Sequence, residues 1–128
     1  GLLDERYIMY SEETDWCYRL RNAGWGVFYL PDAQVIHHGG GSAERYSGQQ
    51  LRLLYRSKVL FFRKFRGSTA AAVLACGIIA ATCAKILAWA LWWVCATGTR
   101  RRRLSRKISA HWQLLRDPQT WVWPSLCE

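Results

Sequence analysis

Three carboxylates stand within four consecutive positions near the start of the chain, in the stretch Met-Tyr-Ser-Glu-Glu-Thr-Asp-Trp. Glu12, Glu13 and Asp15 are this close in a chain whose formal net charge is +9, although neighbouring like charges repel. Such a group can begin a helix, where it favours the positive end of the helix dipole. It can also bind a divalent metal ion or take a proton from a substrate hydroxyl.

A second group of polar residues follows about twenty positions later. His37 and His38 precede Gly39, Gly40 and Gly41, in a loop that few side chains stiffen. Neutral imidazole is a suitable ligand for transition metals, and backbone N–H groups of a glycine loop can approach a phosphate. Residue types alone also allow a structural explanation of this segment. His37 can simply form a hydrogen bond at the end of a strand, and the three glycines can form a flexible turn.

The carboxylates are expected at the start of a helix that runs over residues 12–23. Ser11 stands at the N-cap position, where its hydroxyl can accept from a free backbone N–H. Asp15 and Arg19 form an i, i+4 pair in the favourable order, and Gly24 ends the helix. The spacing therefore places the acidic residues on one short, well-delimited helix.

Two short strands are predicted after this helix, over residues 26–30 and 34–37. Pro31-Asp32 separates them, and the glycine loop follows the second one. A helix followed by two strands and a glycine loop indicates an α/β fold.

The charge is divided unevenly along the chain. Residues 1–46 hold four Lys/Arg against seven Asp/Glu, whereas residues 47–128 hold fourteen against two. This asymmetry predicts an acidic site followed by a basic surface-binding segment. A basic amphipathic helix is expected over residues 48–65, which either packs on a core with a solvated face or lies on a membrane surface.

Residues 69–99 carry a single charge, Lys85, and form a run long enough to cross a bilayer as a helix. Three tryptophans cluster toward its end, as in an interfacial aromatic belt: Trp89, Trp92 and Trp93. Because basic residues flank both ends, a re-entrant hairpin with a bend at Gly77, or a helix in the membrane plane, fits better than a simple span. A helix buried in a soluble core is the alternative.

The remaining composition restricts the classes of site and partner. The five cysteines include no CxxC pair and are odd in number, so neither a disulfide framework nor a zinc site is expected. The arginine run 100–103 adjoins an apolar segment and no recognisable nucleic-acid-binding motif, so we expect no nucleic acid partner.

The first 46 residues resemble the C-terminal part of the catalytic domain of family 2 inverting glycosyltransferases, especially the bacterial rhamnosyltransferase-like branch. Residues 9–19, with the carboxylates, and 29–42, with the histidines and glycines, carry the resemblance in order and spacing. It implies a GT-A fold, which is a Rossmann-like α/β domain that binds a nucleotide-sugar with a divalent metal, Mg²⁺ or Mn²⁺. The chain is then expected to be a C-terminal fragment that lacks the nucleotide-binding half and is inactive alone.

The resemblance also implies roles for individual residues. Inverting transfer is a single displacement in which a carboxylate takes the proton of the acceptor hydroxyl, and a metal can neutralise the diphosphate leaving group. Glu13 stands at the usual position of the base, with Glu12 beside it and Asp15 as a further candidate. His37 matches a histidine that meets the metal or the diphosphate. Substrate-binding roles fall on Trp16, Arg19, His38, Gly39 and Gly40, although Trp16 is also expected to pack in the core.

The function expected from these observations is sugar transfer from a nucleotide-sugar donor to a cell-envelope polysaccharide or lipid-linked acceptor. Nucleotide-sugars are cytosolic, so the enzyme is expected on the cytoplasmic face of a bacterial plasma membrane, held by an anionic membrane surface. A non-catalytic membrane anchor or scaffold is the alternative. The expected organisation has four parts: a catalytic part (1–46), a basic amphipathic helix (47–67), an apolar membrane-associated segment (68–99) and a basic, Trp-rich tail (100–128).

Overall fold

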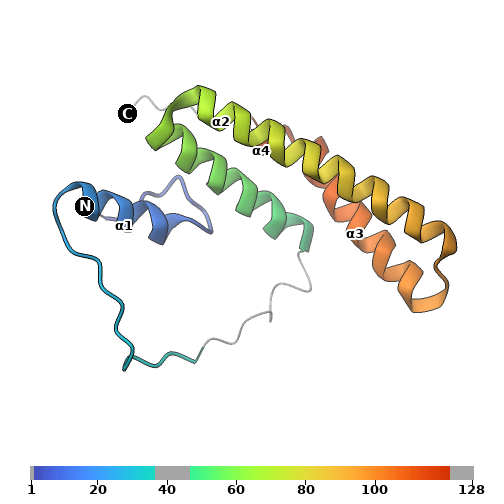
Figure 1. The fold of residues 1–128 in the computed structure, drawn as a ribbon, viewed down its shortest axis with the longest axis horizontal. Coiled ribbons are helices and arrows are strands. Elements are labelled where there is room, and N and C mark those ends of the chain that lie inside the picture. Colours follow the sequence, from blue (N-terminus) through green and yellow to red (C-terminus); the bar gives the residue numbers. More distant parts are fainter. Residues whose placement is uncertain (1, 37–46, 122–128) are drawn as a thin grey trace.

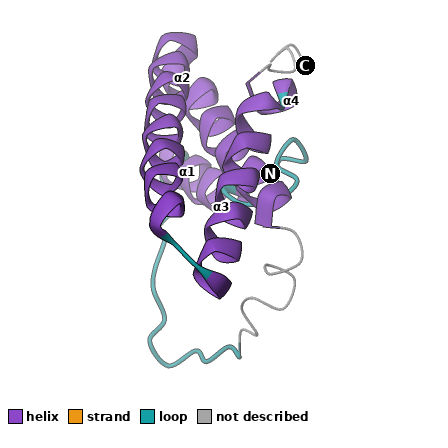
Figure 2. Cartoon of the chain, turned by 90° about the vertical axis from the view of Figure 1, so that its right-hand side faces the viewer, coloured by secondary structure: helices purple, strands orange, loops and turns teal. Residues whose placement is uncertain are grey.

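The computed structural model describes residues 2–36 and 47–121, which form four helices (Figure 1). They are α1 (Glu12–Asn22), α2 (Ser47–Cys95), α3 (Gly98–Arg116) and α4 (Pro118–Trp121). No residue of these two ranges lies in a strand (Figure 2). The prediction of an α/β fold, as a fragment of a Rossmann-like GT-A domain, is therefore wrong for the part of the chain that the structure describes.

The predicted strands 26–30 and 34–37 correspond to irregular, exposed backbone as far as residue 36; His37 lies outside the described residues. Phe28 and Val35 are 86% and 87% exposed. Their residue types favour strands, but that preference comes mainly from packing against neighbouring strands. No described segment supplies such a neighbour, and so the local preference is not realised.

Helix α1 confirms the prediction for residues 12–23 to within one residue. Gly24 has a left-handed φ of 84° and ends the helix, as expected for a glycine after the last turn. Ser11 does stand at the N-cap, but its φ is 67° and its side chain makes no capping hydrogen bond. Its carbonyl oxygen instead accepts from the backbone N–H of Asp15 at 2.8 Å.

Gly67 divides α2 into two straight parts, which we call the basic half (residues 47–66) and the apolar half (residues 68–95). Its φ of 86° and ψ of 172° are not helical, and only glycine adopts this region without strain. The chain reverses there, so that the two halves lie side by side in opposite directions (Figure 1). The predicted basic helix is thus confirmed, and the bend follows it directly.

The apolar half runs through Gly77 without interruption, so the bend predicted there is absent. The chain instead turns at Ala96 and Thr97 into α3, which packs back along α2. The core lies between these helices and consists mainly of small and aliphatic side chains. Its buried members on α2 and α3, with Ala96 between them, are Val59, Leu60, Ala71, Thr82, Leu104 and Leu114.

A buried ionic cluster holds the N-terminal segment on the basic half of α2. Lys64 Nζ donates to Asp15 Oδ1 at 2.5 Å and to Asp4 Oδ2 at 2.7 Å. Arg19 Nε donates to Asp15 Oδ2 at 2.7 Å, which confirms the predicted i, i+4 pair. The Tyr7 hydroxyl donates to Asp15 Oδ1 at 3.2 Å. The Asp15 side chain is fully buried, so its charge depends on these partners.

Aromatic rings and one further hydrogen bond complete this attachment. The ring of Tyr18 on α1 lies 5.6 Å from that of Phe61 and 4.4 Å from that of Phe65, between ring centres. The hydroxyl of Ser57 donates to the carbonyl oxygen of Met9 at 2.7 Å. The N-terminal segment therefore rests on α2 through side chains from about two turns of the basic half.

The ionic cluster shifts the titration of two of its groups. Hydrogen bonds from Arg6 hold the pKa of Asp4 well below its usual range; Lys64 acts in the same direction, and burial opposes both. Burial raises the pKa of Tyr7, and the charge of Asp15 raises it further. Because the pKa of Asp4 is lower in the folded chain, its contribution to stability is complete above the unfolded value of about 3.9 and is lost as the pH falls below it.

Gly67→Ala is expected to destabilise the fold, whereas Gly77→Ala is expected to stabilise it. An added Cβ meets no atom within 4 Å at either position, so the backbone conformation alone determines the effect of each substitution on stability. At Gly67 the non-helical conformation costs a residue with a side chain about 1–3 kcal/mol. Within a regular helix, alanine is favoured over glycine by about 0.5–1 kcal/mol. Denaturant unfolding of the two variants in neutral detergent measures both changes. If both substitutions raise, or both lower, the free energy of unfolding, the prediction is wrong.

Lys64→Met is expected to lower the free energy of unfolding by about 3 kcal/mol or more at pH 7, because it leaves the buried Asp15 without its ammonium partner. Lys58→Met is the matched control. Lys58 is exposed, with its ammonium 5.9 Å from the ring centre of Tyr55 and no ion pair to a carboxylate of residues 2–36 and 47–121, so its loss should cost less than about 0.5 kcal/mol. Equal costs for the two variants at pH 7 would refute a stabilising role for the cluster.

Candidate functional site

An open pocket lies at the N-terminal turn of α1, beside two of the three predicted carboxylates. Glu12, Glu13 and Trp16 of α1 line it together with Leu2 and Leu3 of the preceding segment, around a cavity of about 490 Å³. The structure therefore brings Glu12, Glu13 and Trp16 together. We call this space the glutamate pocket.

The indole ring of Trp16 supplies an apolar wall to this pocket. Its side chain is 42% exposed, and the one buried residue of α1 is Asp15. The prediction that Trp16 packs in the core is therefore wrong, while its predicted contact with substrate is compatible with its position. An exposed indole beside carboxylates is a suitable surface for one face of a sugar ring, which is apolar on the side of its C–H groups.

The two glutamates of the pocket differ in their surroundings. The side chain of Glu13 is exposed, and one of its oxygens accepts from the hydroxyl of Thr14 at 3.2 Å. Glu12 is partly covered, and its Oε2 atom is buried without a hydrogen-bond partner among residues 2–36 and 47–121. Glu13 is thus the carboxylate that a bound hydroxyl can reach from solvent, as a general base requires. An unpaired buried carboxylate oxygen favours a ligand that donates to it.

Asp15 and Arg19 belong to the ionic cluster and not to the glutamate pocket. Both oxygens of Asp15 are engaged by protein donors, which gives this carboxylate a structural role. Arg19 also donates to the carbonyl oxygen of Leu2 at 2.8 Å and so connects the cluster to the pocket wall. The predicted catalytic role of Asp15 and the substrate-binding role of Arg19 stay predictions. Lys64 was missed, because no local pattern links it to a residue 49 positions earlier.

The remaining predicted site residues, His37, His38, Gly39 and Gly40, lie outside the described residues. Within residues 2–36 and 47–121, no three His, Cys, Asp or Glu side chains are grouped as a metal site requires. The described residues therefore do not fit a complete divalent-metal site, and the requirement for Mg²⁺ or Mn²⁺ stays a prediction.

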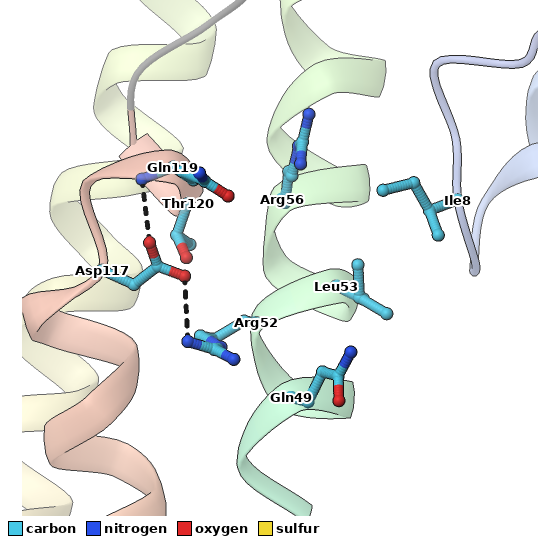
Figure 3. Close-up of a pocket in the computed structure, with 8 residues that line it drawn as sticks. All are labelled: Ile8, Gln49, Arg52, Leu53, Arg56, Asp117, Gln119 and Thr120. Carbon is cyan, nitrogen blue, oxygen red and sulfur yellow. Dashed lines mark hydrogen bonds and ion pairs between the residues drawn. The ribbon is translucent and has the colours of Figure 1, made fainter. Parts of the chain in front are cut away.

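A second pocket, which the sequence did not indicate, lies over the basic half of α2 (Figure 3). Its cavity measures about 180 Å³. Ile8 of the N-terminal segment borders it on one side of α2, and the end of α3 with α4 borders it on the other. Its polar lining consists mainly of Arg52, Arg56, Asp117, Gln119 and Thr120. We call it the arginine pocket.

Comparison with known proteins gives a match over part of the chain. A segment of 61 residues, 48% of this chain, is 41% identical to N-acetylglucosaminyl-diphospho-decaprenol L-rhamnosyltransferase of Mycobacterium tuberculosis, strain CDC 1551 / Oshkosh. The protein of the same name in strain ATCC 25618 / H37Rv matches with the same identity and extent. The match spans 20% of the length of each relative. No family model matches the chain, and no solved structure matches it significantly. About half of this chain is therefore similar to a rhamnosyltransferase, a class of glycosyltransferase, which supports the predicted resemblance in part.

Proposed function

We propose that this chain is the acceptor-binding part of a membrane-associated glycosyltransferase, which transfers a sugar from a nucleotide-sugar to a lipid-linked or polysaccharide acceptor. One observation carries the proposal. An exposed glutamate and an exposed tryptophan line the same pocket, in a chain that is similar over 61 residues to a rhamnosyltransferase. The name of that relative makes rhamnosyl transfer to a diphospholipid-linked sugar the first activity to assay.

In this proposal, the glutamate pocket holds the acceptor. The acceptor sugar lies against the indole of Trp16, and Leu2 and Leu3 cover its edge. Glu13 accepts the proton of the attacking hydroxyl while that oxygen displaces the nucleoside diphosphate at the anomeric carbon, with inversion. A positioned general base of this kind accelerates such a step by about 10²–10⁴-fold. A divalent metal would supply charge neutralisation of the leaving diphosphate, but residues 2–36 and 47–121 hold no complete site for one.

The apolar half of α2 supports membrane association. By length and composition α2 could cross a membrane, with a mean hydropathy of 2.1 in its most apolar stretch, and only 22% of that stretch is buried. Leu87 and Leu91 are 65% and 74% exposed. A core helix of a soluble protein buries most of such a surface, whereas this helix presents it outward. We propose that acyl chains of the bilayer cover it.

Cations stacked on tryptophan rings surround the end of this apolar surface. The shortest such distance is 3.8 Å, from the guanidinium carbon of Arg101 to the ring centre of Trp93. Two further pairs lie within 6 Å near this end: Arg100 with Trp92 and Lys107 with Trp89. Arg116 and Trp112 form a similar pair at the opposite end of α3. Tryptophan and basic residues together are typical of a boundary between acyl chains and anionic headgroups. Because nucleotide-sugars are cytosolic, the proposed location is the cytoplasmic face of a bacterial plasma membrane.

A non-catalytic membrane anchor is the second candidate function, favoured by the large share of the described chain that is basic or apolar helix. The two candidates differ in whether the glutamate pocket performs chemistry. A substitution confined to that pocket therefore separates them.

Glu13→Gln is expected to lower kcat for sugar transfer by about 10²-fold or more, because the amide cannot accept the hydroxyl proton. The assay uses the full-length protein that carries this chain, a labelled nucleotide-sugar and a lipid-linked acceptor. Glu5→Gln is the control, since Glu5 is an exposed carboxylate outside the pocket. Vesicle binding should be the same in both variants. Transfer rates that are equal for the two variants favour the anchor.

Substitution of Leu87 and Leu91 together by Glu is expected to weaken binding to phosphatidylglycerol vesicles more than tenfold, because each charge opposes insertion by about 2 kcal/mol or more. The control is the same change at Val35 and Ile36, which are 87% and 84% exposed but lie outside α2. Vesicle flotation measures both variants. Comparable flotation of the two double variants would disprove an inserted apolar half.

A further inference from the structure

The arginine pocket combines donors from two helices around a small cavity. Arg52 and Arg56 stand one turn apart on the same side of α2, and Gln119 and Thr120 of α4 face them across the pocket (Figure 3). The cavity of about 180 Å³ is several times the roughly 30 Å³ that one water molecule occupies in the liquid. It therefore has room for a small polar group, but not for a folded partner or a peptide segment.

The charges lining this pocket leave one guanidinium without a carboxylate. Asp117 is its single acidic lining residue. One Asp117 oxygen pairs with Arg52 at 3.2 Å, and the other accepts from the backbone N–H of Gln119 at 3.0 Å. Arg56 has no hydrogen bond or ion pair with any residue of the described ranges. Its planar group of donors fits two oxygens of a phosphate at once.

Thr120 gives a second, independent indication of a ligand. It is 1% exposed, and its buried Oγ1 atom lacks a hydrogen-bond partner in the part of the chain that the structure describes. Buried hydroxyls are almost always hydrogen-bonded, so an unpaired one at the pocket wall favours a bound group with an acceptor.

We propose that the arginine pocket binds a phosphate-bearing group between Arg56 of α2 and Thr120 of α4. The phosphate oxygens accept from the Arg56 guanidinium and the Thr120 hydroxyl, while the ion pair of Arg52 with Asp117 fixes the pocket floor. Ile8, two thirds exposed at the rim, provides an apolar edge on which a short acyl segment can rest. This site is independent of the role of Glu13, so failure of the sugar-transfer proposal leaves it standing.

Two sources can supply such a phosphate: a free inorganic phosphate or diphosphate, and the headgroup of a phospholipid. The experiment measures both on the whole chain in uncharged detergent by titration calorimetry. One arm uses inorganic pyrophosphate, and the other uses a soluble short-chain phosphatidylglycerol. Saturable binding in the first arm alone assigns a free phosphate, and tighter binding in the second assigns a lipid headgroup.

Arg56→Gln is expected to weaken binding of the better probe at least about tenfold, and Thr120→Val about fivefold, because each removes a donor to a charged acceptor. Arg66→Gln is the matched control: Arg66 is exposed on the same half of α2 outside the pocket, and its loss should change binding less than about twofold. Thr120→Val should leave the unfolding midpoint unchanged or raised, since its hydroxyl bonds no described protein group.

The proposal is overturned by either of two results. Equal weakening by Arg56→Gln and Arg66→Gln means that a general basic surface, and not a site, attracts the phosphate. The absence of saturable binding to both probes by the folded wild-type chain means that the pocket holds only water. Thr120→Val keeps the test decisive if Arg56→Gln fails to fold.

Discussion

The ion pair between Lys64 and Asp15 is the constraint on which the rest of the described structure depends. It joins α1 to the basic half of α2 across 49 positions of sequence, at 2.5 Å and with the carboxylate fully buried. Burying a charge costs several kcal/mol unless it is well paired. A slide of α1 by one turn would separate Asp15 from this ammonium while leaving the carboxylate covered. The pair therefore fixes the register of the two helices more firmly than the neighbouring aromatic contacts, which tolerate small shifts.

That register determines the geometry of the glutamate pocket. Arg19 bonds both Asp15 and the carbonyl oxygen of Leu2, so the segment that forms one wall is tied to the helix that forms the other. Glu13 and Trp16 project from the first turns of that helix. The three neighbouring carboxylates consequently divide their roles: the buried one holds the element in place, and the other two line the space where a ligand can lie.

Local features of this chain could be predicted from the sequence, and pairings between distant residues could not. Helix α1, its ending at Gly24 and the Asp15–Arg19 pair depend on residues within one or two turns, so their spacing predicts them. The strands failed because β-structure needs a partner that single-segment propensities do not contain. Gly67 and Gly77 are both glycines in a helical pattern, yet only Gly67 breaks α2, and residue type alone does not distinguish the two positions. The arginine pocket likewise arises only when α4 reaches α2.

The distribution of partners among the basic residues explains why two of the proposed ligands, the membrane surface and the phosphate-bearing group, are anionic. The chain holds eighteen Lys/Arg and nine Asp/Glu, so carboxylates cannot pair with every cation. The described carboxylates nearest α2 are already in ion pairs. Asp4 pairs with Arg6 and Lys64, Asp15 pairs with Arg19 and Lys64, and Asp117 pairs with Arg52. The arginines that begin α3 stack on tryptophan rings, which leaves their charge intact. A surface whose cations are stacked and not neutralised keeps a positive potential, and phosphate-bearing surfaces are the partners that such a potential selects.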